Sequence, residues 1–142
     1  MAKQRTLAII KPDAMEAAKA GAIIARIQEE GFTICGMRQL KLTLEQAEGF
    51  YDVHRERPFF GELTTFMSRS EIVVMALEAE EAITKWRNVI GATDPGKADD
   101  GTIRKLYGKD LGENAVHGSD APETAAHEIG YFFPGYEVRP SA

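Results

Sequence analysis

Hydrophobic residues along the chain occur either in short continuous runs, typical of buried strands, or at helical spacing. Residues 7–10 form a continuous apolar run that ends at Lys11 and Pro12, which predicts a central strand buried on both faces. Residues 72–77 have the strongest strand pattern in the chain. Further strands are predicted over residues 33–42 and 115–117.

Between these strands, apolar residues recur three or four positions apart, which predicts amphipathic helices. Thr43 and Gln46 have the spacing of a capping box, and Pro58 suits the first turn of a further helix. Residues 92–113 are rich in Gly, Asp and Lys and show weak periodicity, so they are predicted to form a long loop. A further short helix is predicted from residue 120 to near Ile129. The apolar stripes of the other predicted helices are Ala20, Ile23, Ile24 and Ile27; Leu44, Ala47 and Tyr51; Phe59, Leu63 and Phe66; and Ile83, Trp86 and Ile90.

The predicted elements follow the order strand, helix, strand, two helices, strand, helix, strand, helix. This order favours an α+β sandwich of the ferredoxin-like, split βαβ type, with a four-stranded antiparallel sheet covered by helices. The sequence contains no internal repeat and no low-complexity linker. We therefore expect residues 1–142 to form a single domain.

Composition narrows the functional classes. The chain is 44% hydrophobic and 27% charged, which is typical of globular proteins, and its net charge of −5 argues against a broad nucleic-acid surface. No apolar run approaches the roughly 20 residues of a membrane helix, and no secretory signal is recognisable at the start. We therefore expect a cytoplasmic location. The single cysteine, Cys35, excludes an intrachain disulfide.

Residues 91–98 almost spell a phosphate-binding P-loop, which requires Ser or Thr after the Gly-Lys pair. Here Ala98 stands in the place of the hydroxyl residue that would hold Mg²⁺. The segment also follows a predicted helix, whereas a P-loop follows a strand. We therefore reject a P-loop.

Of the three histidines, His54 is most simply a polar surface or hinge residue, and His127 is most simply exposed to solvent. His117 differs because an apolar strand precedes it and Ser119-Asp120 open a helix directly after it. A helix start offers unpaired N–H groups and the positive end of the dipole, which suits phosphate. Neutral imidazole is also a nucleophile at cellular pH. Spacing alone leaves both a catalytic and a structural role open for His117.

A phosphate-carrying histidine also needs cations for the transferring group and a carboxylate to hold its tautomer. Lys11, Arg87 and Arg104 are candidate cations, and Glu128 is the candidate carboxylate if its helix folds back toward the strand. Each of these residues taken singly is more often a solvated surface charge. Their convergence cannot be deduced from spacing.

The chain resembles bacterial nucleoside diphosphate kinases over essentially its whole length. The most specific segment is residues 114–120, Asn-Ala-Val-His-Gly-Ser-Asp. The other matching segments, in the family's order, are residues 5–13, 47–51, 57–60, 91–93 and 101–104.

The resemblance implies a ping-pong phosphotransferase that maintains nucleoside triphosphate pools. His117 would take the γ-phosphoryl group on Nδ1 and pass it to a nucleoside diphosphate. Glu128 would hold the other ring nitrogen, and Ser119 would lie beside the transferring phosphate. The remaining roles implied are phosphate binding by Lys11, Arg87, Thr93 and Arg104, a place for Tyr51 near Lys11 and His117, ribose contacts by Asn114 and Lys11, and base stacking by Phe59.

The resemblance also implies Mg²⁺ as cofactor. The chain shows no dedicated carboxylate cage, so we expect the nucleotide phosphates to hold the ion. The family forms tetramers or hexamers built from a common dimer, and the short tail after Phe133 favours the homotetramer over the homohexamer. Two other functions remain open: a non-catalytic nucleotide-binding relative, and a single-strand nucleic-acid binder that uses Phe59 and the arginines.

Three segments depart from the family pattern. Asp100 stands where proline usually precedes Gly-Thr-Ile-Arg, and Asp94 replaces the usual asparagine. Residues 70–71 are Ser-Glu in place of Gly-Pro. None of the implied site residues is altered, so the departures bear on loop rigidity and subunit contacts.

Overall fold

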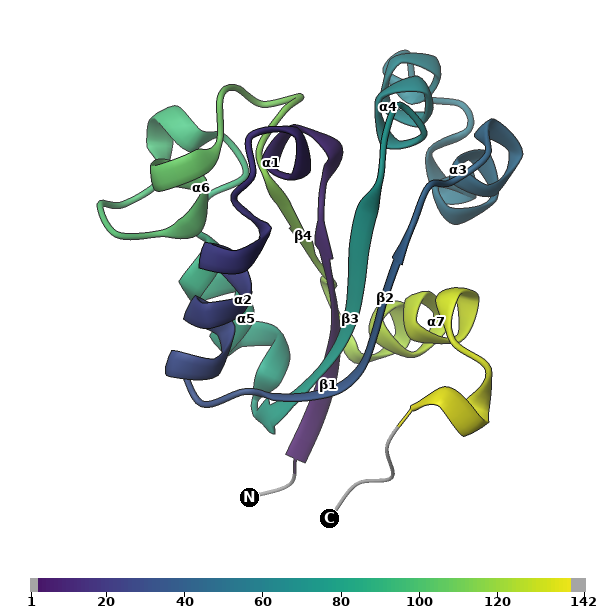
Figure 1. The fold of residues 1–142 in the computed structure, drawn as a ribbon. Helices are drawn as coiled ribbons and strands as arrows, with labels where there is room; N and C mark the ends of the chain where they lie inside the picture. The colour runs from purple at the N-terminus through teal and green to yellow at the C-terminus, as the bar shows by residue number, and fades with distance from the viewer. Residues whose placement is uncertain (1–2, 139–142) are drawn as a thin grey trace.

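A computed structural model describes residues 3–138, which contain a four-stranded sheet in the order β2-β3-β1-β4 (Figure 1). The strands are β1 (Lys3–Ile10), β2 (Thr33–Leu40), β3 (Ile72–Glu80) and β4 (Val116–Gly118). All neighbouring strands are antiparallel. The predicted split βαβ, ferredoxin-like sheet is therefore confirmed.

The two central strands separate two hydrophobic cores. Along β1, Leu7 and Ile9 belong to one core, while Ala8 and Ile10 belong to the other. Side chains in a strand alternate between its two faces, so burial on both faces requires an unbroken apolar run. This requirement explains why β1 and β3 read as continuous hydrophobic segments.

Helices cover both faces of the sheet, giving three layers (Figure 1). One face carries α2 (Ala20–Glu29), α5 (Ala82–Ile90) and α6 (Ile103–Tyr107), and the other carries α3 (Leu44–Phe50), α4 (Phe60–Met67) and α7 (Pro122–Phe132). Trp86 on α5 is completely buried against the first face. None of the helices among residues 3–138 is long and apolar enough to cross a membrane.

The long loop predicted over residues 92–113 is wrong in part. It contains α6, whose N-cap Thr102 accepts a hydrogen bond from the backbone of Lys105, and a 3₁₀ turn at Pro95–Lys97. A second short helix, α1 (Pro12–Glu16), was also not predicted. Each of these α-helices has five residues, which is too short for a helical stripe to repeat.

Several predicted boundaries also shift. β1 begins at Lys3 because it pairs with β3 as far as Glu80, and β2 ends at Leu40 because Leu40 faces the first residue of β3. Pro58 precedes α4 instead of lying in its first turn, and α7 continues beyond Ile129 to Phe132. Strand pairing sets the first two boundaries, and a single-strand pattern does not contain that information.

Candidate active site

His117 lies on β4, the shortest strand, which pairs with β1 opposite Ile9. The indole Nε1 of Trp86 donates a hydrogen bond to the backbone oxygen of His117 at 3.0 Å. At Gly118, a Cβ atom would lie 2.7 Å from Cδ1 of Trp86, so the strand approaches α5 more closely than a side chain allows. The backbone of His117 is thereby held between β1 and the buried Trp86.

The imidazole is oriented by α7, which folds back toward β1. Nε2 of His117 lies 2.9 Å from Oε1 of Glu128, and both side chains are mostly buried, with 18% and 16% exposed. A ring nitrogen beside a carboxylate carries the proton, so the lone pair of the neutral ring is on Nδ1. The arrangement leaves Nδ1 as the nucleophilic nitrogen.

Ser119 is hydrogen-bonded to Glu128. Its hydroxyl donates a hydrogen bond to the same Oε1 at 2.7 Å and accepts one from the backbone N–H of Leu7 at 3.1 Å. The residue is completely buried. These contacts join Ser119 both to the carboxylate of Glu128 and to β1.

Lys11 comes directly after β1 and is buried. Its Nζ donates to Oδ1 of Asn114 at 2.8 Å, and Nδ2 of Asn114 donates to the backbone oxygen of Thr93 at 3.0 Å. Burial, together with the nearby Arg104, lowers the pKa of Lys11 to about 8. The three predicted residues Lys11, Thr93 and Asn114 therefore meet in one chain of hydrogen bonds.

The two arginines lie beside this chain. Buried Arg104 donates through Nη2 to the backbone oxygen of Val116 at 2.8 Å, and burial lowers its pKa to about 10. Arg87 is half exposed and its Nη1 lies 2.5 Å from Oδ1 of Asp120. Two cations thus flank the strand that carries His117.

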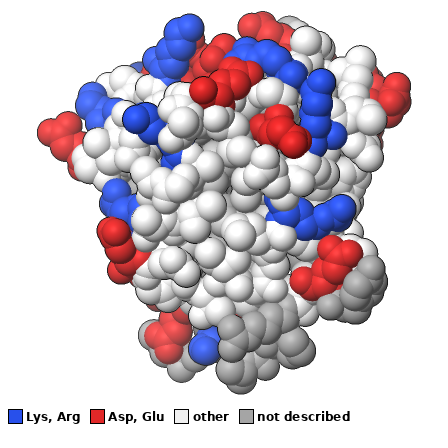
Figure 2. All heavy atoms as spheres, in the orientation of Figure 1, with Lys and Arg blue, Asp and Glu red and all other residues white. Residues whose placement is uncertain are grey.

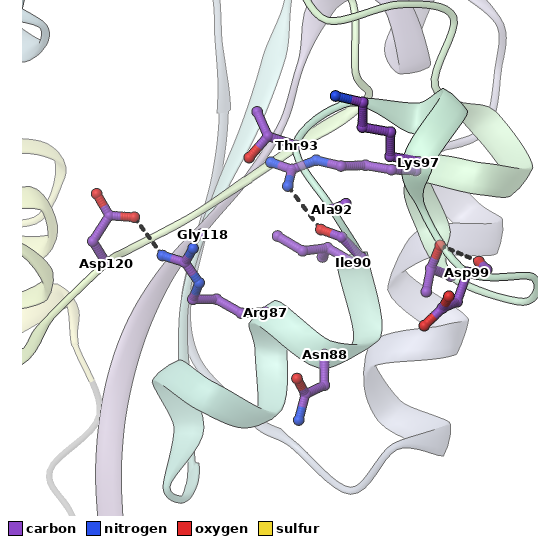
Figure 3. Close-up of a pocket in the computed structure, with 12 residues that line it drawn as sticks. Arg87, Asn88, Ile90, Ala92, Thr93, Lys97, Asp99, Gly118 and Asp120 are labelled. Atoms are coloured by element: carbon purple, nitrogen blue, oxygen red, sulfur yellow. Dashed lines mark hydrogen bonds and ion pairs between the residues drawn. The ribbon is translucent and has the colours of Figure 1, made fainter.

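A pocket of about 380 Å³ opens beside β4. Figure 3 shows Arg87 extending from α5 toward Asp120 across this pocket, with Thr93 above it. Arg104 and Gly118 also line the pocket. Its size and its cationic, hydroxyl and backbone donors suit a polyanionic ligand.

Tyr51 is buried, whereas Phe59 is 47% exposed. The ring of His54 joins them, at 6.5 Å from the Tyr51 ring and 5.5 Å from the Phe59 ring. Burial and the nearby Glu128 raise the pKa of Tyr51. Phe59 therefore lies at the outer end of an aromatic row that begins beside the Glu128 carboxylate, and His54 is part of this row, not a plain surface residue.

Within residues 3–138, four buried side-chain polar atoms have no hydrogen-bond partner, and three belong to this site: Oη of Tyr51, Nε of Arg104 and Oδ1 of Asp13. A buried polar group without a partner is costly, and such groups cluster where function requires them. The first two are donors of the kind that a bound polar ligand satisfies.

Sequence reasoning did not identify several residues that shape the site. Trp86 was predicted only as a core residue, Asp120 only as part of a helix start, and Asp13 only as part of a matching segment. The ring of Phe50 also packs edge-on against His117, with centroids 5.7 Å apart. No local signal distinguishes these residues, because each acts through a contact across the fold.

The described residues contain no group of three or more His, Cys, Asp or Glu side chains able to hold a metal ion. Asp99 and Asp120 are the carboxylates that line the pocket. Two carboxylates are fewer than the oxygen ligands that a divalent cation takes.

Comparison with known proteins identifies the family. The family model described as nucleoside diphosphate kinase matches residues 4–138. The chain belongs to the nucleoside diphosphate kinase family. It is therefore a phosphotransferase that moves the γ-phosphoryl group of a nucleoside triphosphate to a nucleoside diphosphate, by a ping-pong mechanism through a phosphohistidine.

Individual relatives agree with this assignment. A nucleoside diphosphate kinase of Sorangium cellulosum is 68% identical over 142 residues, which cover all of this chain and 99% of the relative. One from Pelobacter propionicus is 60% identical over 135 residues, covering 95% of this chain and 98% of the relative.

Solved structures of nucleoside diphosphate kinases share the fold. The enzyme of Aquifex aeolicus superposes with a TM-score of 0.94 at 47% identity, covering 96% of this chain and 99% of the other. The enzyme of Halobacterium salinarum, solved in complex with CDP, has a TM-score of 0.94 at 33% identity, covering 99% and 94%.

Proposed function

We propose that His117 is the residue that carries the phosphoryl group in this nucleoside diphosphate kinase. The observation that carries the proposal is the bond between Nε2 of His117 and Glu128, which leaves the lone pair on Nδ1; the next residue, Gly118, lines the pocket together with Arg87 and Arg104. A nucleophile, an orienting carboxylate and fixed cations are the parts that phosphoryl transfer requires.

In the first half-reaction, the Nδ1 lone pair attacks the γ-phosphorus of the donor. The Nδ1–P bond forms, the bond from phosphorus to the β,γ-bridging oxygen breaks, and the nucleoside diphosphate leaves with the electron pair. The ring becomes cationic while the phosphoryl group is attached, and Glu128 compensates that charge at Nε2. The second half-reaction reverses these changes on a different diphosphate.

The cations Lys11, Arg87 and Arg104 compensate the charge of the phosphate chain in this proposal, with Thr93 as a hydroxyl donor. Asn114 and Lys11 bind the ribose hydroxyls, which their mutual hydrogen bond supports. Phe59 stacks on the base, since its exposed ring lies at the outer end of the aromatic row. Stacking without many base-edge contacts accommodates several bases.

Tyr51 and Ser119 complete the proposed site, Tyr51 by direct contact and Ser119 by positioning Glu128. Tyr51 is buried near Glu128 with its hydroxyl unpaired, so it donates to the reacting group or the bound nucleotide. Ser119 holds Glu128 through the bond to Oε1. We propose that its hydroxyl also lies beside the transferring phosphate, as the resemblance implies.

We also propose that Mg²⁺ enters with the nucleotide, held mainly by phosphate oxygens. The pocket fits this arrangement because its cationic lining leaves only Asp99 and Asp120 as anionic oxygen donors. The ion neutralises phosphate charge when it is bound. The protein's own contribution is to bind and align the phosphate chain.

For assembly we propose a homotetramer built from dimers, with a homohexamer as the alternative; the solution mass distinguishes them. The substrates, nucleoside tri- and diphosphates, are intracellular metabolites, and a cytoplasmic location follows from that role.

We propose no obligatory nucleic-acid partner: the face in Figure 2 intersperses basic and acidic side chains without a continuous basic stripe. Tight nucleic-acid binding at physiological salt would overturn this last statement.

Incubation with γ-³²P-labelled ATP and Mg²⁺ tests the assignment of His117. We expect acid-labile, alkali-stable label on the wild type, discharged by any nucleoside diphosphate. His117→Gln should take up no label, whereas His127→Gln, which changes an exposed histidine on α7, should label like the wild type. Label retained and turned over by His117→Gln would show that another residue is the nucleophile.

A further inference from the structure

Ala115, two residues before His117, has a left-handed backbone with φ of +73°. The backbone N–H of Val116 bonds to the oxygen of Asn114 at 2.9 Å, which closes a three-residue turn around Ala115. Turns of this hand are rare and strained for a residue with a Cβ atom. Ala115 is also completely buried, so its surroundings must hold the conformation.

The residues that follow β1 hold this turn on both sides. Oδ2 of Asp13 accepts a hydrogen bond from the backbone N–H of Ala115 at 3.0 Å. The backbone N–H of Lys11 donates to the oxygen of Ala115 at 2.8 Å. A carboxylate that accepts a backbone N–H forms a charge-assisted bond, which is stronger than a bond between neutral groups.

The turn determines how two site residues lie relative to each other. Asn114, before the turn, bonds to Nζ of Lys11 and to the backbone of Thr93. His117, after the turn, is in register with Ile9. A change in the Ala115 dihedral would therefore alter the position of the nucleophile relative to Asn114.

We propose that Asp13 is a positioning residue for phosphoryl transfer, because its carboxylate holds Ala115 in the left-handed conformation and so aligns His117 with Asn114. The proposal rests on the assignment of His117 as the phosphate carrier. It assigns to Asp13 a role that neither its position nor its charge in the sequence indicates.

A different explanation for any effect of Asp13 is its charge, which favours the protonated form of nearby Lys11. The two explanations predict different results for two variants. If Asp13 acts through the backbone, Asp13→Asn keeps an oxygen that accepts from Ala115, and glycine at position 115 removes the need for support, because glycine adopts positive φ readily. If Asp13 acts through charge, neither change preserves the phosphorylation rate.

The experiment measures the rate constant of phosphorylation by γ-³²P-labelled ATP in a quenched-flow apparatus, with nucleotide saturating. We expect Asp13→Ala to slow phosphorylation by about tenfold to a hundredfold, the effect of misplacing a reacting group by about an ångström. Asp13→Asn should slow phosphorylation much less. Adding Ala115→Gly to Asp13→Ala should recover most of the rate.

Asp110→Ala is the matched control, because Asp110 also accepts backbone N–H groups, from Gly112 and Glu113, in an exposed loop. It should phosphorylate at the wild-type rate. If Asp13→Ala does not fold, Asp13→Ala/Ala115→Gly is compared with Ala115→Gly alone. The proposal requires these two rates to agree within about threefold, because a glycine turn needs no carboxylate.

The failures are distinguishable. An unlabelled wild type would refute the assignment of His117 and not the role of the turn. A labelled wild type with a folded Asp13→Ala variant of equal rate would refute the positioning role. Equal losses in Asp13→Ala and Asp13→Asn, without rescue by glycine, would assign the effect to charge and also refute it.

Discussion

Glu128 is the side chain whose removal most directly tests how the site orients His117. Its Oε1 accepts from both His117 Nε2 and Ser119 Oγ, at 2.9 and 2.7 Å. Glu128→Gln keeps an oxygen of the same shape but removes the negative charge. A hydrogen bond to a charged group contributes about 1.5–3 kcal/mol, against about 0.5–1.5 kcal/mol for a neutral pair.

The stabilisation that Glu128→Gln removes should be larger in the transition state than in the free enzyme, because the imidazole becomes cationic as the phosphoryl group is attached. Both side chains are less than one-fifth exposed, so solvent screens this interaction only partly. We expect Glu128→Gln to lose about 1.5–3 kcal/mol of transition-state stabilisation, or about ten- to a hundredfold in rate. The free energy of unfolding should fall by about 1–2 kcal/mol.

The assay is the phosphorylation rate constant under single-turnover conditions, with urea unfolding to measure stability. Glu123→Gln makes the same chemical change in the first turn of the same helix, where the side chain is exposed. It should leave the phosphorylation rate unchanged. A Glu128→Gln rate within threefold of the wild type, or an equal loss in Glu123→Gln, would refute the orienting role of Glu128.

Three further predictions follow from the cations and the packing. Lys11 has a pKa of about 8, and bound phosphates favour its charged form, so diphosphate affinity should be constant below pH 8 and fall up to about tenfold per pH unit above it. Calorimetry in two buffers should detect the proton uptake. An affinity that does not change up to pH 9.5 would contradict this prediction. Asp120→Asn frees Arg87 from an exposed ion pair, so diphosphate should bind about two- to fivefold tighter at low salt and equally at 1 M salt. Gly118→Ala forces a Cβ atom against Trp86, so it should cost about 1–3 kcal/mol in urea unfolding and abolish labelling; wild-type stability would show that the strand can move away.

The strands and long helices were predictable from the sequence because each has a local signal. The apolar runs of β1 and β3 reflect burial on both faces, and the stripe through Ile83, Trp86 and Ile90 reflects one buried helix face. Short elements carry no such signal. α1 and α6 therefore escaped prediction, although α6 contributes the buried Arg104 to the site.

The proposed site residues come from the resemblance, because the segment of residues 114–120 is specific for the family. Their arrangement does not. Nothing in the spacing shows that the hydroxyl of Ser119 bonds to Glu128 or that Arg87 pairs with Asp120. These contacts join residues on different elements, and they depend on how α7 and α5 pack on the sheet.

Periodicity predicts the α+β class, and the resemblance of the motifs supplies the candidate nucleophile His117 and the charged residues expected around it, since periodicity and motif are local properties. The structure adds that Ser119 bonds to the same Glu128 oxygen as His117, that Lys11 is buried with a lowered pKa, and that the Asp13 carboxylate accepts a hydrogen bond from Ala115. The physical reason is that hydrogen-bond direction and burial depend on residues that are close in space and distant in the chain. Asp13 and Ala115 are 102 residues apart, and one hydrogen bond between them joins the end of β1 to the turn before His117.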